Sequence, residues 1–209
     1  GKNQSELISK IKAAKPDMIA LTGDIVDEDH DSISSVEDLL KGIKDLAPIY
    51  FVTGNHELTS LAATQYQELL ALFQKYGVTD LDNDSVKLKK GGQSITLYGR
   101  QYFSQYLTDS LPIASDKDFD ILLYHGSDNF KEIAPYHYDL ILSGHAHGGI
   151  VRLPIWGGIF GNDGTFFPEY AGGEYTIGDA TLISSRGLGD ASIPRFNNPP
   201  ELVVIKLNP

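Results

Sequence analysis

Four apolar runs of this chain end in the same way, with a glycine beside a side chain that can bind a metal ion. The runs are ALTGD (20–24), FVTGNHE (51–57), LLYHG (122–126) and LILSGHAHGG (140–149). Short apolar runs that end at glycine predict buried strands, and ligands of α/β sheets bind at the carboxyl ends of the strands. We therefore expect one rim of a sheet to collect these side chains.

The first part of the chain predicts alternating helices and strands. Apolar residues at helical spacing predict helices, and short apolar runs predict buried strands. The expected helices lie at 5–17, with Pro16 as a stop, at 35–46 and at 64–77, closed by Gly77, and the expected strands lie at 18–24 and 48–57. This order favours an α/β layered fold with parallel strands.

The second part of the chain is richer in strands. Two alternating segments flank Gly91-Gly92 and predict a hairpin. Further strands are expected at 118–126, 138–149, 174–187 and 201–207. Without repeats or linkers, residues 1–209 are expected to form a single two-sheet domain.

Charge and composition exclude several classes of function. The chain has 17 Lys and Arg against 28 Asp and Glu, so its net charge is −11 and nucleic acid is not an expected partner. A small phosphorylated substrate remains compatible, because a bound metal ion reverses the local field. The absence of cysteine excludes disulfides, thiolate metal sites and Cys nucleophiles. No apolar run approaches the ~18 residues needed to cross a bilayer.

The strand ends carry five candidate metal ligands: Asp24, Asn55, His125, His145 and His147. A carboxylate such as Asp24 can bridge two cations about 3.5–4 Å apart. Imidazole and oxygen ligands without thiolate favour Mn, Fe or Zn over Ca or Mg. Each residue alone also fits an ordinary turn, cap or strand end, so the prediction of a metal site rests on all four runs together.

The remaining histidines and aromatic residues are assigned other roles. His30 and His137 lack a neighbouring glycine and a strand end, so both are expected at the surface, with His30 a weak candidate for the edge of the site. The aromatic segments 103–112 and 153–170, which include Trp156, favour a loop core over an apolar groove for an acyl or glycan substrate.

The motifs GDIVD, GNHE, YHG and GHAHGG, in this order and spacing, resemble the calcineurin-like metallophosphoesterase family. The tail SRGLGDASIPRFNNPPELVVIKL resembles the bacterial YkuE/YaeI-type branch of that family, and the resemblance spans residues 15–207. It implies the metallo-dependent phosphatase fold, a four-layer α/β/β/α sandwich of two mixed sheets flanked by helices.

The resemblance also implies a phosphoesterase with two divalent metal ions and a metal-bridging hydroxide. Asp24 would bridge the two metals. Asn55, His125 and His145 would complete the second metal site, and His147 would belong to the first. The expected substrate is a phosphomonoester or phosphodiester of a small or lipid-linked molecule.

Four further residues receive roles beside the metal ligands. His56 would act as general acid or phosphate stabiliser at the leaving-group oxygen, as a protonated imidazole can. Glu57 would either orient His56 or lie at the surface. Arg195 is a weak candidate for substrate binding, although a structural ion pair is the favoured role for both Arg195 and Arg186.

The chain departs from the family pattern at its start, where the D-x-H motif has no counterpart. Without that motif the first metal keeps Asp24 and His147 alone, so the alternative is a catalytically impaired metal-binding domain in which only the second metal site is complete. Loss of a buried strand exposes apolar surface at about 25 cal/mol per Å², which is comparable with a domain stability of ~5–15 kcal/mol. We therefore expect the D-x-H strand in the folded parent protein, which we expect to be an active monomer able to associate with membranes through an N-terminal segment.

Overall fold

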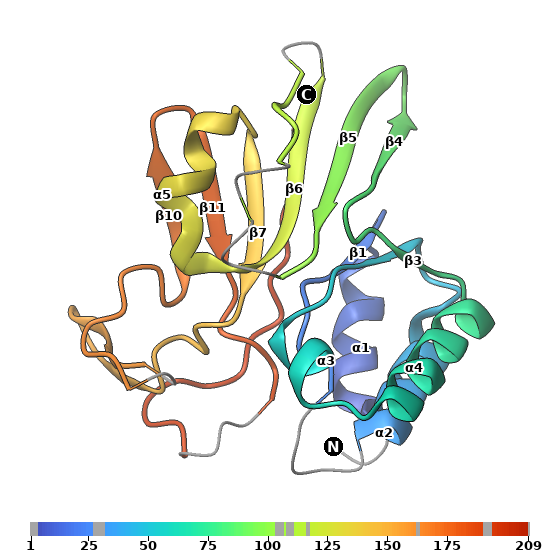
Figure 1. The fold of residues 1–209 in the computed structure, drawn as a ribbon, viewed down its shortest axis with the longest axis horizontal. Helices are drawn as coiled ribbons and strands as arrows, with labels where there is room; N and C mark the ends of the chain where they lie inside the picture. Colours follow the sequence, from blue (N-terminus) through green and yellow to red (C-terminus); the bar gives the residue numbers. More distant parts are fainter. Residues whose placement is uncertain are drawn as a thin grey trace.

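The computed structural model describes residues 4–26, 32–102, 107, 111–115, 118–161, 164–189 and 194–208. Two β-sheets pack face to face, and helices cover their outer faces (Figure 1). Within the described ranges, no helix has the length and apolar character that a membrane span requires.

The smaller sheet has three short parallel strands in the order β1-β2-β3. The strands are β1 (Ile19–Leu21), β2 (Ile49–Phe51) and β3 (Val78–Asp80), and the helices beside them are α1 (Ser5–Ala14), α2 (Ser32–Ile43), α3 (Asn55–Thr59) and α4 (Ala63–Tyr76). Side chains alternate along β2, since Ile49 and Phe51 pack with the helices while Tyr50 packs between the sheets. The central strand β2 is therefore buried on both faces.

The larger sheet has six strands in the order β10-β11-β7-β6-β5-β4. The strands are β4 (Ser85–Lys90), β5 (Gln93–Arg100), β6 (Phe119–Gly126), β7 (Leu140–Gly144), β10 (Gly173–Ile177) and β11 (Ala180–Ser184). The four inner strands run parallel, and the two edge strands β4 and β10 are antiparallel to their neighbours. The hairpin expected at Gly91-Gly92 is the β4–β5 pair.

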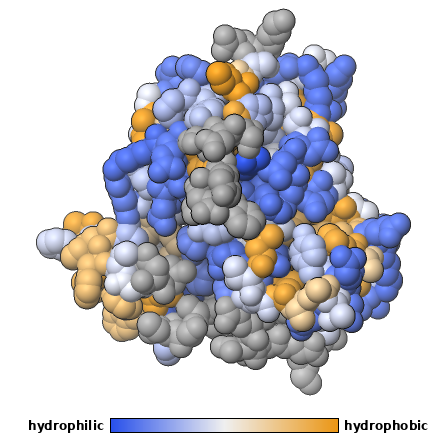
Figure 2. All heavy atoms as spheres, in the orientation of Figure 1, coloured by the Kyte–Doolittle hydropathy of each residue, from blue (hydrophilic) through white to orange (hydrophobic). Residues whose placement is uncertain are grey.

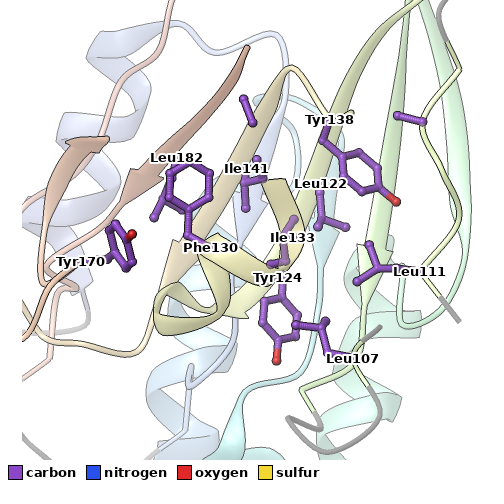
Figure 3. Packing of buried hydrophobic residues seen from close by; sticks show 12 residues of the cluster. Leu107, Leu111, Leu122, Tyr124, Phe130, Ile133, Tyr138, Ile141, Tyr170 and Leu182 are labelled. Atoms are coloured by element: carbon purple, nitrogen blue, oxygen red, sulfur yellow. The ribbon is translucent and has the colours of Figure 1, made fainter. Parts of the chain in front are cut away.

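The outer face of the larger sheet has its own apolar core. Leu122 and Tyr124 of β6 point into this cluster, where Phe130 and Ile133 of the short helix α5 (Phe130–Ile133) cover them (Figure 3). Ile121 and Leu123, the alternate residues of β6, pack against the smaller sheet instead. The layers are therefore helix, sheet, sheet and helix, and the fold expected from the family resemblance is confirmed.

The structure differs from the expectations in the C-terminal part. Residues 201–207, expected as a strand, belong to no described strand, and Val204 is exposed. A strand forms only where a neighbour pairs with its backbone, and apolar composition does not supply that neighbour. An unexpected hairpin of β8 (Val151–Leu153) and β9 (Gly157–Phe160) precedes this tail. In the described sheet β1 lies at an edge beside β2, and the D-x-H strand stays a prediction.

Candidate metal centre

Side chains from four strand ends meet at one point between the two sheets. Asp24 follows β1, Asn55 follows β2, His125 lies near the end of β6 and His145 follows β7. Asp24 Oδ2 lies 3.0 Å from His125 Nε2, which lies 3.2 Å from His145 Nδ1. His145 Nδ1 lies in turn 3.0 Å from Asn55 Oδ1. Four of the five predicted ligands are thus brought together.

The backbone at the smaller sheet is shaped for this approach. Asp24 has a left-handed backbone (φ 51°), and its Oδ1 accepts the backbone N–H of His56 at 2.9 Å. A Cβ atom at Gly54 would overlap the Asp24 carboxylate. The glycine of the GNHE motif is therefore required so that the loops after β1 and β2 can touch.

Glu57 fixes these two loops, which corrects both roles expected for it. Its side chain is buried, and its carboxylate does not orient the His56 ring. It accepts four backbone N–H groups at 2.7 to 3.3 Å, those of Asp24, Ile25, Val26 and Gly54. Burial and the nearby Asp24 charge raise the pKa of Glu57. Glu57 therefore ties the Asp24 loop to the start of α3.

The cluster has the donor chemistry of a metal site. His125 Nδ1 lies 2.6 Å from the Thr22 carbonyl oxygen, which can only accept, so this nitrogen carries a proton. In the neutral ring, His125 Nε2 is then an acceptor that faces Asp24 Oδ2. Acceptor atoms that converge in a buried place need a cation between them. Ligand atoms of Asp24, His125 and His145 all lie within 4.8 Å of one another, so the residues fit a divalent metal ion.

The charges of this cluster are coupled. Burial alone would raise the pKa of Asp24, but the hydrogen bond and charge of His125, together with His56, hold it below its usual value. Burial opposes the charge of His125, but the carboxylate of Asp24 raises its pKa. Without a metal ion, the pKa values of Asp24 and His125 are therefore both shifted in the direction that favours the charged forms.

His147 lies outside the group of mutually close ligand atoms. Its ring Nδ1 is buried without a hydrogen-bond partner among the described residues, and burial, with help from Arg195, lowers its pKa to about 4. His145 and His147 both have left-handed backbones, with φ of 69° and 49°. Such strain persists only where surrounding structure fixes the loop. His147 thus offers a neutral imidazole next to the cluster, and its role as a ligand stays a prediction.

His56 sits at the mouth of the cluster. Its Nε2 lies 3.8 Å from Asp24 Oδ2, its side chain is 25% exposed, and its Nδ1 lies 3.4 Å from Ser60 Oγ. An imidazole that lies beside the Asp24 carboxylate and still reaches solvent can meet a substrate. This position is compatible with the acid role predicted for His56.

Two features of the site escaped the sequence analysis. Tyr102, just after β5, packs its ring 5.2 Å from the rings of both His125 and His145. Asn198, in the C-terminal tail, is buried and donates to the His147 carbonyl oxygen at 2.6 Å. Tyr102 stands in none of the motifs, and Asn198 stands in the tail that resembles the YkuE/YaeI-type branch, where nothing in the sequence marks it as a support of the site.

The two arginines of the tail are held differently. Arg186 forms the expected ion pair, with Nη2 2.5 Å from a carboxylate oxygen of Glu201. Arg195 donates to backbone carbonyl oxygens, at 2.7 Å to Arg186, 2.5 Å to Gly189 and 3.5 Å to His147. These carbonyl contacts give Arg195 a structural role in the tail.

The other sequence-based assignments have mixed outcomes. His137 is exposed, as expected, whereas His30 and residues 103–106 and 108–110 lie outside the described residues. Trp156 and Phe166 are 70% and 72% exposed, so the loop core expected over 153–170 is wrong for these side chains. Trp156 lies in the β8–β9 hairpin and Phe166 in the loop after it, and the two strands of this hairpin pair with each other and not with either of the described sheets.

Comparison with known proteins places the chain among phosphoesterases. The family model described as calcineurin-like phosphoesterase matches residues 2–149. The uncharacterized metallophosphoesterase YkuE of Bacillus subtilis is 30% identical over 209 residues, which cover 96% of this chain and 71% of that protein. The phosphodiesterase YaeI of Escherichia coli is 27% identical over 195 residues, which cover 92% of this chain and 71% of that protein.

A similarity to a solved structure concerns the fold alone. The sulfate thiohydrolase SoxB of Thermus thermophilus, in complex with glycerol, superposes with a TM-score of 0.53 and 16% identity. The match covers 87% of this chain and 37% of that chain. The larger protein thus contains an arrangement of sheets like the one described here.

Proposed function

The chain belongs to the calcineurin-like phosphoesterase family and is a metal-dependent phosphoesterase, and from this premise we propose that it hydrolyses a phosphodiester or phosphomonoester of a small or lipid-linked molecule at a dinuclear site. The observation that carries the proposal is the meeting of Asp24, Asn55, His125 and His145 at distances of 3.0 to 3.2 Å. Such a cluster of acceptors is costly to bury unless it holds a cation.

The residues divide into two sets of ligands. Asp24, Asn55, His125 and His145 would hold one divalent ion, and Asp24 with His147 would contribute to the other. Divalent ions supply Lewis-acid activation of water and neutralise charge on the phosphoryl oxygens. The nitrogen and oxygen donors favour Mn, Fe or Zn.

The side chain that moves a proton is His56. Its Nε2, 3.8 Å from Asp24 Oδ2, stands beside the cluster and reaches solvent. In its protonated form it donates to the oxygen of the departing alcohol. The Thr22 carbonyl fixes the tautomer of His125 by accepting from Nδ1, which turns Nε2 toward the cluster.

The test combines metal reconstitution with two aryl esters. Protein stripped by a chelator is reloaded with Mn²⁺, Fe²⁺ or Zn²⁺ and assayed on p-nitrophenyl phosphate and bis(p-nitrophenyl) phosphate. We expect at least one metal to restore hydrolysis, and Asp24→Asn to abolish it. Asp45→Asn is the matched control, since this carboxylate is 82% exposed and pairs with Lys44.

Metal content per chain separates the proposal from its alternative. Two ions per chain with turnover support a dinuclear phosphoesterase. One ion per chain without turnover on either ester favours the impaired metal-binding domain, an alternative motivated by the small ligand set that Asp24 and His147 form for the first metal. No metal binding at all would refute both readings.

A further inference from the structure

The β8–β9 hairpin and the loop after it expose large apolar side chains. We define the apolar tip as Leu153, Ile155, Trp156, Phe166 and Phe167, which are 43%, 103%, 70%, 72% and 57% exposed. Figure 2 shows hydrophobic residues gathered at the left of the molecule, where Figure 1 places the orange segment that contains β8 and β9. The molecule therefore presents a concentrated apolar surface there.

The two parts of the apolar tip are fixed to each other. Phe160 and Phe166 form a β-bridge, and their rings lie 5.4 Å apart. The backbone N–H of Phe167 donates to the Ile159 carbonyl oxygen at 2.8 Å. The exposed rings thus belong to one supported surface.

The shape and charge of this surface are unusual for this chain. Ile155, at the turn, has a left-handed backbone (φ 76°), which is strained for a β-branched residue, and its side chain is fully exposed. The segment 153–167, which spans the apolar tip, contains one charged residue, Asp163, in a chain with 17 basic and 28 acidic residues. Its exposed Ile, Trp and Phe side chains have the composition of segments that enter the lipid interface.

The apolar tip is built directly onto the candidate metal centre. β8 starts four residues after His147, and Arg152 donates to the Gly148 carbonyl oxygen at 2.5 Å. A hollow of about 250 Å³ is lined by Phe166, Phe167 and Ala146, the residue between His145 and His147. Anything that covers the tip therefore lies close to the site.

Neither of the two described hollows offers an apolar site in which the apolar tip of a second copy of the chain could bind. One hollow is lined by Lys87, Lys89 and Lys90 with the Gly91-Gly92 turn, so it is charged. The other contains Phe166 and Phe167 of the tip and is also lined by the acidic residues Asp128 and Glu169, so it is not a purely apolar receptor. The net charge of −11 also disfavours an anionic partner.

We propose that the apolar tip docks the protein on a lipid bilayer of neutral headgroups, with Ile155 and Trp156 inserted in the interface. The proposal does not rest on hydrolysis, because bilayer binding is measured without any phosphate-ester assay. Docking by the tip brings the bilayer surface next to the loop that carries His145 and His147.

Trp156 is the single tryptophan of the chain, so its fluorescence reports on the apolar tip alone. Phosphatidylcholine vesicles should shift its emission to shorter wavelength, and brominated phosphatidylcholine should quench it. Ile155→Gly removes the side chain and relieves the left-handed strain, so we expect an unchanged or higher melting temperature and vesicle affinity lowered about tenfold. Ile113→Gly is the control, because Ile113 is also 70% exposed but lies in the segment 111–115.

Three results would overturn the proposal. The first is an emission spectrum that vesicles leave unchanged. The second is a shift that depends on protein concentration without lipid, which would mean that a second copy covers the tip. The third is an equal loss of vesicle affinity in Ile155→Gly and Ile113→Gly.

Discussion

The smaller sheet brings Asp24 and Asn55 to the site from strands of three residues each, whereas the larger sheet brings His125 and His145 from strands of eight and five residues. The long strands hold their ends through pairing of β6 with β7, which resumes at Gly126 and Gly144 after a register shift that follows Leu123. The short strands cannot do this, and the buried carboxylate of Glu57 holds their loops instead.

The two sheets also differ in the functional groups that they bring to the site. The smaller sheet supplies a carboxylate, an amide and the partly exposed His56, while the larger sheet supplies two imidazoles, of which His125 contacts the Thr22 carbonyl oxygen through Nδ1. We predict that the smaller sheet carries the proton donor on loops fixed by Glu57 and that the larger sheet contributes only metal ligands. The following predictions test that division.

The largest effects should separate His56 from His145. We expect His145→Ala to lose metal affinity and activity on every substrate, because it removes a ligand. His56→Ala should keep metal affinity, since the N–H that supports Asp24 belongs to the backbone, and should lower turnover of esters with poor leaving groups by roughly 10²–10⁴-fold. Turnover and metal affinity are measured for both variants.

The leaving group provides the check on His56. An aryl phosphate needs less help from a proton donor, so His56→Ala should affect it less than an alkyl phosphate. Equal losses on both esters would show that His56 stabilises phosphate and donates no proton. His137→Ala is the control, because His137 is exposed.

The next effect concerns Glu57, which holds together the loops that follow β1 and β2 of the smaller sheet. Each carboxylate oxygen of Glu57 accepts two backbone N–H groups. In Glu57→Gln the side-chain NH₂ would replace one of these oxygens and leave two N–H donors without an acceptor. We expect the free energy of unfolding to fall by about 2–4 kcal/mol in urea denaturation. Glu68→Gln, an exposed substitution on α4, should change it by less than about 0.5 kcal/mol. Similar stabilities of the two variants would show that the short strands hold their loops unaided.

A smaller effect on metal binding is expected at the loop after β7, where Asn198 supports His147. Asn198→Ala removes the donor to the His147 carbonyl oxygen, and we expect the affinity for divalent metal to fall about tenfold in a competition titration with a chelator. Asn197→Gly is the neighbouring control, because Asn197 is exposed and a glycine tolerates its φ of 51°. An unchanged metal affinity in Asn198→Ala would leave His147 without a demonstrated role.

The sequence predicted the site wherever a strand end carried the ligand. Asp24, Asn55, His125 and His145 share a rim because the strands that precede them are parallel within each sheet and the sheets face each other. The supports of this rim could not be predicted in the same way. Glu57 bonds to residues about thirty positions away and Asn198 to a residue 51 positions away, and no local pattern encodes such contacts.

The structures of the C-terminal tail and of the β8–β9 hairpin could not be predicted from the sequence either. Residues 201–207 have the composition of a strand, but pairing depends on a neighbour and not on composition. Trp156 was expected in a loop core because apolar residues are usually buried, yet it lies on a hairpin that neither sheet covers. Burial was therefore predictable for regular elements and not for connections.

The smallest effect on catalysis should come from Arg195→Ala, which tests whether the tail reaches the substrate. The Arg195 guanidinium donates hydrogen bonds to the carbonyl oxygens of Arg186, Gly189 and His147. These bonds fix the tail. We expect an unfolding free energy lower by about 1 kcal/mol, measured in urea, and an unchanged KM for bis(p-nitrophenyl) phosphate. Arg195→Lys should restore part of the stability, since one ammonium can replace one of the carbonyl contacts but not all of them. A KM raised tenfold at unchanged stability would instead show that Arg195 binds the substrate. The residues beside the larger sheet would then bind the ester as well as the metal.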